Sequence, residues 1–433
     1  MPSISGQTYR LLQRTLSPLC GLSQMVTLTL RSRGEPKFIT SGGELTGVHV
    51  WLNQPPPRPG AYHIGASARS LDECLIKTLG ETIERYSHYA VAKLLKHRFA
   101  SVHDMKERGE PIPDLQDLAF WTDEQLDNKH FPFRNLHEQD SVAWLDSVSV
   151  TGQHLWLPSQ MILTGYQIRT DLREPWLFPA VTTGTAAHTD PLLAIKNALL
   201  EIVQLDAAMG HWFSNTRTPQ IILDARTAGL ADTISRAFAG SDFAPSFALL
   251  CNPDLFGISV ACLLENKKSG TPGVVVGLGS AWKLEEAMYK ALKEATGVLQ
   301  LVKFVSLTPR DTNIANIADL DTNVAWYAKP VNSSIVLDKF LSGLKINAGD
   351  VAADFHGSDA EAMEKTVHSF AATGKRLFIY DFTTADIRDL AFHAIRAFSP
   401  DTLSLCLPSF CPRGHRRFAA YDGFRNVHPH PFA

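Results

Sequence analysis

The sequence predicts an α+β fold in which helices and strands form mixed layers. Short apolar runs bounded by turn residues alternate with longer segments whose apolar residues recur at helical spacing. No low-complexity tract interrupts this alternation, and 433 residues are enough to bury a substantial core. We expect strands at 219–224, 246–251, 256–264, 273–278 and 377–382, and a β-hairpin at 143–158.

The composition excludes several classes of protein. Hydrophobic residues make up 45% of the chain and charged residues 20%, which is typical of a soluble globular protein. The formal net charge of −3 argues against a general nucleic-acid-binding protein, because such proteins usually carry a basic surplus. No apolar run approaches the roughly 20 residues that span a membrane, and no signal for secretion is recognisable. We therefore expect a cytoplasmic protein that binds neither nucleic acid nor membrane.

The cysteines and the irregular segments carry little functional signal. Cys74 and Cys262 lie in apolar runs and are expected to be buried thiols. Cys406 and Cys411 lack the paired spacing of a structural zinc site. Residues 55–60 are rich in proline and resemble a linker, and residues 107–140 are expected to be a surface excursion.

Three segments repeat one pattern: a turn of glycine and small residues, an amphipathic helix, and a glutamate several turns into that helix. The turns are expected at 65–68, 183–187 and 277–281, and the glutamates that follow are Glu81, Glu201 and Glu294. A helix that served only packing would turn such glutamates to water. Their repetition at matched positions therefore predicts a shared site for a metal or a polyanion, and the turns could present backbone N–H groups to anions.

The helices themselves have clear start signals. Ser70 and Glu73 form a capping-box pattern, and Asp190 followed by Pro191 is typical of a helix start. The apolar positions of the three helices predict one buried face on each. That face includes Leu79, Ile83, Leu199, Ile202, Ala291 and Leu292.

Further polar residues accompany the three glutamates. Glu84 and Gln204 lie three residues after Glu81 and Glu201, and Lys77, Asn197 and Lys290 lie four residues before the three glutamates. A single Lys–Glu pair at this spacing is usually a surface contact, but its repetition favours a common site. Carboxylate and amide oxygens suit Mg²⁺, and the lysines could neutralise phosphate oxygens. The motifs GxxxxGK[ST], GxSxG and HExxH are absent from the sequence, so their sites are not predicted.

At these residues the chain resembles the YcaO family, from about residue 60 to the C-terminus. The resemblance rests on segments 79–87, 182–187, 201–207, 290–295 and 380–387, taken in this order and spacing. Members of the family bind ATP and Mg²⁺ between such helices and activate a backbone amide oxygen by phosphorylation. The resemblance implies a YcaO-type ATP-binding fold with three turn–helix–Glu units around a central cleft.

The resemblance also implies roles for individual residues and domain boundaries. An N-terminal segment (1–60) would pack on a YcaO catalytic domain (61–420), followed by a proline-rich tail (421–433). The residues expected to bind ATP are Lys77, Glu81, Glu84, Asn197, Glu201, Gln204, Lys290 and Glu294. The residues expected to hold Mg²⁺ are Glu81, Glu84, Glu201 and Gln204.

The C-terminus resembles the Pro-x-Pro-x-Pro tail of azoline-forming members, with Ala433 in place of the last proline. Pro429, Pro431 and Ala433 are therefore expected to reach the active site and to contribute to catalysis. Two other interpretations remain open. The tail could be an exposed, protease-resistant end, and His428 and His430 could form a metal-binding pair.

The implied reaction is the cyclodehydration of Cys, Ser or Thr in a ribosomally made precursor peptide. A separate protein related to ubiquitin-activating enzymes would bind the leader peptide, and an FMN-dependent azoline dehydrogenase could follow. We expect a homo-oligomer or a hetero-complex. ATP-dependent thioamide formation is one alternative. A non-catalytic scaffold is the other, because Gln204 and Ala433 depart from the residues usual in the family. Leu205, Ser67 and Ala68 are further departures near the nucleotide site.

Overall fold

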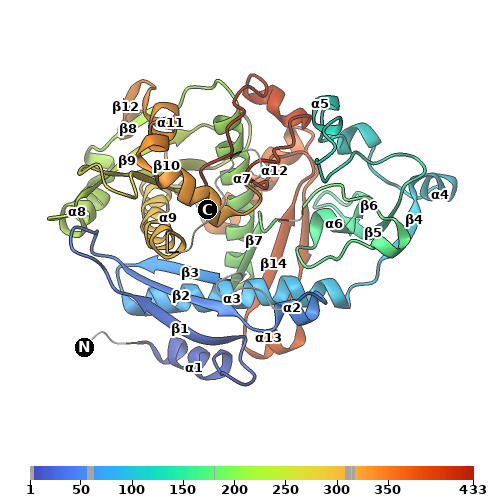
Figure 1. Ribbon diagram of the computed structural model, residues 1–433, viewed down its shortest axis with the longest axis horizontal. Helices are drawn as coiled ribbons and strands as arrows, with labels where there is room; N and C mark the ends of the chain where they lie inside the picture. The colour runs from blue at the N-terminus through green and yellow to red at the C-terminus, as the bar shows by residue number, and fades with distance from the viewer. Residues whose placement is uncertain (1–3, 56–62, 180, 308–313, 315–316) are drawn as a thin grey trace.

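The computed structural model describes residues 4–55, 63–179, 181–307, 314 and 317–433, and within these residues the strands form four sheets around a set of long helices (Figure 1). Most of the linker-like segment 55–60 lies outside the described residues. None of the described helices is both long and apolar enough to cross a membrane.

The N-terminal sheet is antiparallel and has the order β1-β2-β3. Its strands are β1 (Ser23–Thr29), β2 (Ile39–Leu45) and β3 (His63–Ala68). The helices of this region are α1 (Gly6–Thr15), α2 (Val48–Trp51) and α3 (Leu71–Leu94). Helix α3 contacts all three strands, and α1 packs beside it. The N-terminal segment thus shares one sheet with the strand that precedes the first glutamate helix.

The largest sheet has the order β11-β10-β9-β8-β12 and is antiparallel except between β8 and β12. Its strands are β8 (Gln220–Ile222), β9 (Phe243–Leu250), β10 (Ile258–Asn266), β11 (Val274–Ala281) and β12 (Lys345–Asn347). The four strands expected in this region are confirmed with small shifts at their ends.

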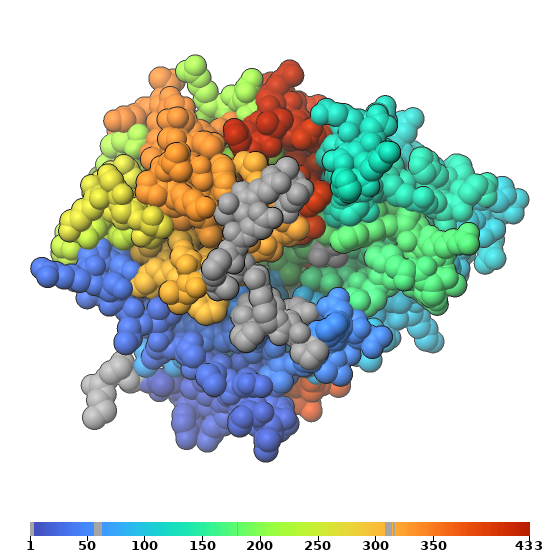
Figure 2. Space-filling model, in the orientation of Figure 1, coloured from blue at the N-terminus to red at the C-terminus, as the bar shows by residue number. Residues whose placement is uncertain are grey.

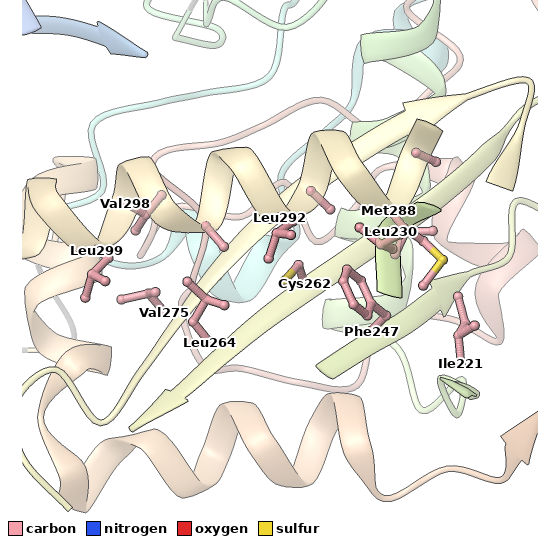
Figure 3. Close-up of a cluster of buried hydrophobic side chains, with 14 of the residues drawn as sticks. Ile221, Leu230, Phe247, Cys262, Leu264, Val275, Met288, Leu292, Val298 and Leu299 are labelled. Atoms are coloured by element: carbon pink, nitrogen blue, oxygen red, sulfur yellow. The ribbon is translucent and has the colours of Figure 1, made fainter. Parts of the chain in front are cut away.

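Helices cover both faces of this sheet. The helices are α7 (Pro191–Phe213), α8 (Ala228–Ala237), α9 (Leu284–Val305), α10 (Leu320–Ala328) and α11 (Pro330–Leu341). Apolar side chains of α8 and α9 pack with one face, where Leu292 and Met288 lie over Cys262 and Phe247 (Figure 3). Apolar side chains of α7 and α11 pack with the opposite face.

Glycine allows α9 to lie directly on β11. A Cβ atom at Gly277 would lie 2.1 Å from the backbone nitrogen of Ala295, and one at Gly279 would lie 2.3 Å from the carbonyl oxygen of Ala287. Any larger residue would push the helix off the strand. The small residues expected to form turns at 65–68 and 277–281 therefore lie in strands, whereas Thr183 and Gly184 form the expected turn, with Gly184 at a φ of 79°. The role of Gly277 and Gly279 is close packing of the following helix.

A third sheet has the order β13-β14-β7 and a fourth the order β4-β5-β6, both antiparallel. The third contains β7 (Thr185–His188), β13 (Phe378–Asp381) and β14 (His393–Phe398). Helix α12 (Asp359–Ala372) precedes β13 in sequence, and α13 (Ala385–Asp389) lies between β13 and β14 in sequence. The fourth contains β4 (Arg98–Ser101), β5 (Ser141–Val148) and β6 (His154–Pro158), with α4 (Val102–Glu107), α5 (Asp123–Leu126) and α6 (Ser159–Ile162). Strands β5 and β6 form the expected hairpin, and β13 is the expected strand at 377–382. Short 3₁₀ helices lie at Leu115–Leu118, Thr170–Leu172, Ala225–Thr227, Ala348–Asp350 and Arg416–Tyr421.

The expectation for residues 107–140 is only partly correct, because many polar side chains of the segment are exposed but its aromatic side chains are not. The segment is irregular, but its aromatic side chains form a core rather than a surface excursion. Trp121 is buried, stacks on Phe133 with ring centroids 4.9 Å apart, and donates to the carbonyl of Leu177 at 2.7 Å. Burial of such rings stabilises the segment more than its polar composition suggests.

The cysteine expectations agree with the structure. Cys74 and Cys262 are fully buried thiols, and Cys406 and Cys411 are buried as well. All six cysteines are free.

Candidate functional site

The three glutamate helices belong to three matched strand–helix units. Strand β3 precedes α3, β7 precedes α7 and β11 precedes α9, and each of these strands is the edge strand of its own sheet. Asp190 caps α7 with Pro191 in its first turn, as expected. Ser70 caps α3 by accepting from the N–H of Glu73, but the Glu73 side chain turns to lysines instead of completing the capping box.

Two of the glutamates accept hydrogen bonds from the edge strands that precede their helices. The backbone N–H of Gly65 donates to Glu81 at 3.0 Å, and that of Leu278 donates to Glu294 at 3.1 Å. Both pairs are 16 residues apart in sequence. A backbone N–H on an open sheet edge has no partner strand and needs another acceptor. The two carboxylates accept these hydrogen bonds, and the hydrogen bonds in turn fix the orientation of the carboxylates.

The units are also packed in a ring. Beyond its own strand, α3 contacts β7, α7 contacts β11, and α9 contacts β3. Direct hydrogen bonds join the units. Thr185 of β7 donates from Oγ1 to Glu84 of α3 at 2.5 Å, and the hydroxyls of Ser67 on β3 and Thr296 on α9 share a hydrogen bond at 2.7 Å. This cyclic arrangement brings the three helices together in the middle of the molecule (Figure 1).

Four carboxylates interact in this centre. Burial raises the pKa of Glu201 well above its ordinary value, and the charges of Glu84 and Glu294 raise it further. Burial also raises the pKa of Glu84. The pKa of Glu294 is raised to about 7 by burial and by Glu81, although the hydrogen bond from Leu278 opposes the shift. Glu294 is nevertheless exposed to solvent. Its carboxylate therefore lies in a recess that protein atoms surround and that solvent reaches.

Two arginines that the sequence analysis did not select lie among these carboxylates. Arg85 is 3.3 Å from Glu81 and 3.8 Å from Glu84. Burial lowers the pKa of the Arg85 guanidinium, but Glu84 and Glu81 outweigh it and raise the pKa. Burial lowers the pKa of Arg396, on β14, to about 10, with Glu201 and Glu84 acting in the opposite direction. Arg85 was detectable as the neighbour of Glu84, whereas Arg396 has no local signal.

Several buried nitrogen atoms beside the carboxylates are unsatisfied. Within the described part of the chain, Arg85 Nη1, Arg396 Nε and His88 Nε2 have no hydrogen-bond partner. Burial lowers the pKa of His88 to about 3, so its ring is neutral. Its Nδ1 lies 2.8 Å from the carbonyl of Glu84 and must be the protonated nitrogen. Unsatisfied polar atoms at this density indicate a place for water or a ligand.

The lysine expectation requires a correction. Lys77 pairs with Glu73 at 2.9 Å and Lys290 with Glu286 at 3.1 Å, so each lysine pairs with the glutamate one turn before it rather than with the glutamate after it. Lys293, which the sequence analysis did not select, pairs with Glu73 at 2.7 Å. Burial and the charge of Lys77 lower the pKa of Lys293 to about 8. The pairs leave Glu81 and Glu294 without a lysine partner among the described residues.

The remaining expected ligands are present without forming a closed site. Asn197 is exposed on α7, and Gln204 is half-buried on the same helix. In the described residues, no group of three or more His, Cys, Asp or Glu side chains is arranged to hold a metal ion. Glu201 and Gln204 also accept no side-chain hydrogen bond there. The metal-ligand set thus stays a prediction.

The late motif segment 380–387 joins the same centre. Tyr86 of α3 donates a hydrogen bond to Asp386, and Tyr380 of β13 lies opposite Arg396 of β14 in the antiparallel ladder. The motif segments at 79–87 and 380–387, far apart in sequence, are therefore side by side in the fold.

The C-terminal tail is buried rather than an exposed end. Its carbonyl oxygens accept hydrogen bonds from three side chains: Trp212 to His428 at 3.0 Å, Tyr327 to Pro429, and Asn323 to His430. Pro429 and Pro431 are buried, and the terminal Ala433 is half-buried.

Aromatic packing fixes the end of the tail. Phe432 is buried and contacts the rings of Trp212, Phe340 and His430. His430 is fully buried, and its Nε2 contacts the carbonyl of Cys406 at 2.9 Å. Ala433 packs against the apolar cluster of α9, the helix that carries Glu294.

Comparisons with known proteins agree with this geometry. Residues 66–403 match the family described as YcaO cyclodehydratase, ATP- and Mg²⁺-binding. The chain belongs to this family. The match confirms the predicted family, its class of enzyme, and ATP and Mg²⁺ as the cofactors of the family. No curated protein sequence matches the chain significantly.

Solved structures share the fold at low sequence identity. A heterocyclase in complex with substrate and cofactor is 16% identical with a TM-score of 0.76, over 98% of this chain and 57% of that chain. YcaO from Methanopyrus kandleri bound with AMPPCP and Mg²⁺ is 13% identical with a TM-score of 0.60, over 88% and 86%. The E. coli microcin synthetase McbBCD complex with pro-MccB17 bound is 13% identical with a TM-score of 0.64, over 94% of this chain and 96% of that chain. The chain therefore spans little more than half of the heterocyclase chain. The α+β fold of YcaO type is confirmed.

Proposed function

We propose that this protein catalyses ATP- and Mg²⁺-dependent cyclodehydration of Cys, Ser or Thr residues in a ribosomally made peptide. The bound nucleotide would supply the phosphoryl group that converts the backbone amide oxygen into a leaving group. The product would be a thiazoline or oxazoline ring. The relatives whose names include a heterocyclase and a microcin synthetase support this choice of reaction.

The observation that carries the proposal is the convergence of four glutamates from three helices beside two buried arginines. Burial and the repulsion from neighbouring carboxylates disfavour the ionised forms of Glu84, Glu201 and Glu294. A cation placed among them would relieve both costs, and hard oxygen ligands suit Mg²⁺. The residues present therefore fit the cofactors of the family.

Each expected residue has a place in this proposal. Glu81, Glu84, Glu201 and Gln204 would hold Mg²⁺. Lys77 and Lys290 would neutralise phosphate oxygens, and Asn197 and Glu294 would complete the nucleotide site. Arg85 and Arg396 add to this set, because they interact with the carboxylates directly.

The tail would align the peptide. Pro429 and Pro431 restrict the backbone, and anchored carbonyls hold the tail in one path. Ala433 ends beside α9, so its terminal carboxylate would lie near the reacting peptide. A separate leader-binding protein related to ubiquitin-activating enzymes would present the peptide. An FMN-dependent dehydrogenase would oxidise the rings in pathways that contain one.

Mass spectrometry of the peptide after incubation with ATP and Mg²⁺ tests the reaction. Each ring formed removes the mass of one water, whereas thioamide formation replaces oxygen by sulfur and adds mass. Single changes of Glu81, Glu84 and Glu201 to Gln should reduce ATP turnover by about 100-fold or more while the unfolding temperature stays within a few degrees. Glu107→Gln is the matched control, because that side chain is 67% exposed on α4. Wild-type turnover in all three site variants would reject the assignment.

A scaffold role is the second candidate, and Gln204 is the observation that favours it. A neutral amide at this position lowers the negative charge available to a cation. ATP binding without turnover in the wild-type protein, with peptide binding retained, would support the scaffold.

A further inference from the structure

The outer edge of the N-terminal sheet, formed by β1, lacks the charged residues that usually prevent an edge strand from pairing with another chain. Within the described residues, β1 pairs with β2 on one side. On its other side only Ser23 is paired, through a bridge to Leu16 and a hydrogen bond from the N–H of Ser17, so the edge from Gln24 to Thr29 is open. The sequence carries no charged residue from Thr15 to Leu30. Large apolar side chains are nevertheless exposed there: Leu19 at 92%, Met25 at 61%, Leu28 at 50% and Leu30 at 88%.

Open edges normally carry charges, proline or a bulge that prevents pairing with another strand. The irregularity in β1 lies between Ser23 and Val26, and the ladder to β2 is regular from Val26 to Thr29. Pro18 lies outside the strand. The part of β1 with exposed apolar side chains thus keeps a regular, uncharged edge that can accept a further strand.

The ends of this edge are basic. Residues 1–40 contain five basic side chains and one acidic one, a formal charge of +4 in a chain whose total is −3. Arg14 and Arg31 donate to backbone carbonyls, of Asp389 and Glu35, instead of to carboxylates. The single acidic side chain, Glu35, pairs with Lys303 at 2.8 Å. Positive charge therefore remains at both ends of β1.

We propose that β1 is a docking edge for a partner protein that adds a β-strand flanked by acidic residues. The added strand would hydrogen-bond to the open side of β1, cover Met25 and Leu28, and place its acidic residues beside Arg14, Arg31 and Arg33. A second copy of this chain is a poor occupant, because its own edge brings the same +4 charge. The proposal does not depend on the reaction proposed above.

The location adds a consequence for the functional site. Strand β1 is the outermost of three strands, with α1 beneath it, at the rim of the molecule (Figure 1). At the opposite edge of the same sheet, Gly65 of β3 donates to Glu81. The space-filling view shows the N-terminal residues meeting the segments that carry α9 and the fourth sheet on one face of the molecule (Figure 2). A docked partner would therefore be two strands away from the glutamate centre.

The test uses the full chain and two synthetic peptides of alternating Thr and Val, one with two Glu at each end and one with two Lys. Hydrogen exchange should show protection of β1 amides by the Glu-flanked peptide. Fluorescence anisotropy should show that it binds about tenfold tighter than the Lys-flanked peptide at low salt, with the difference shrinking as salt rises. A Glu-flanked peptide with N-methylated valines should not bind.

Variants of the full chain make the test specific. Leu28→Lys should abolish protection of β1, whereas the control Val331→Lys, at a side chain 79% exposed on α11, should not. Combined Arg31→Glu and Arg33→Glu changes should reverse the preference between the two peptides. Absence of protection at β1, equal binding of both peptides, or a dimer of the chain that Leu28→Lys dissociates would each overturn the proposal.

Discussion

Replacing Glu294 by Gln should stabilise the protein at neutral pH when nucleotide and Mg²⁺ are absent. Burial and the charge of Glu81 raise the pKa of Glu294 from an ordinary value of 4.5 to about 7. Gln is similar in size and keeps an oxygen that can accept from the N–H of Leu278. The change therefore removes the charge and leaves the hydrogen bond.

The sign follows from proton binding. Because the pKa is higher in the folded state, the folded protein holds a proton that the unfolded chain releases between pH 4.5 and about 7. Stability is therefore present at low pH and is lost as pH rises through this window. The full difference in pKa corresponds to ~3 kcal/mol. Since the side chain faces solvent, screening reduces the expected effect to ~1 kcal/mol.

Urea unfolding at pH 5 and pH 8 measures this difference. The wild-type protein should lose ~1 kcal/mol more between the two pH values than Glu294→Gln does, and the control Glu107→Gln should behave as the wild type. Adding Mg²⁺ and ATP should raise the free energy of unfolding of the wild-type protein more at pH 8 than at pH 5. If Glu294→Gln shows the same loss between pH 5 and pH 8 as the wild type, the environment assigned to Glu294 is wrong.

Three further changes test the packing. Ile202→Ala in the buried face of α7 should lower the free energy of unfolding by about 2–5 kcal/mol, while Leu192→Ala, exposed by 52% on the same helix, should cost little; similar costs would mean that α7 is oriented differently. Asp206→Ala removes the closest partner of the buried Arg417, at 2.6 Å, and should lower the free energy of unfolding by about 3–5 kcal/mol. The control Asp232→Ala, at an exposed ion pair, should lower it by less than about 1 kcal/mol. Phe432→Ala should cost about 3–5 kcal/mol in chemical unfolding because the tail is part of the core; an unchanged stability would show that the tail is not docked in solution.

The burial of the tail changes how its function must be tested. If the tail contributes to catalysis, deletion of residues 429–433 should stop cyclisation and leave ATP affinity unchanged. The structure shows that this deletion would also remove Phe432 from the core. Deletion of Ala433 alone is the cleaner variant, because that residue is half-buried and terminal. Slower cyclisation with unchanged unfolding would support a direct role of the terminus.

Local sequence signals determined the parts of this protein that depend on neighbours in the chain. The cap at Ser70, the Asp190–Pro191 helix start and the apolar faces of α3, α7 and α9 follow from spacing and side-chain chemistry alone. The three glutamates could be selected for the same reason, since each occupies the same place in a helix. Their convergence could be inferred only from their repetition and from the family resemblance.

The tertiary structure decided what depends on distant contacts. Small residues such as those of Gly277–Ala281 fit a turn equally well in isolation, and only the close approach of α9 makes them a strand. The pairs of Lys77 and Lys290 were ambiguous because a lysine can reach a glutamate one turn before or after it. Arg396, far from Glu84 and Glu201 in sequence, joined them only through the pairing of β14 with β7. The burial of the tail depended on Trp212, Tyr327 and Asn323, whose donors match its carbonyl oxygens in space but leave no pattern along the chain.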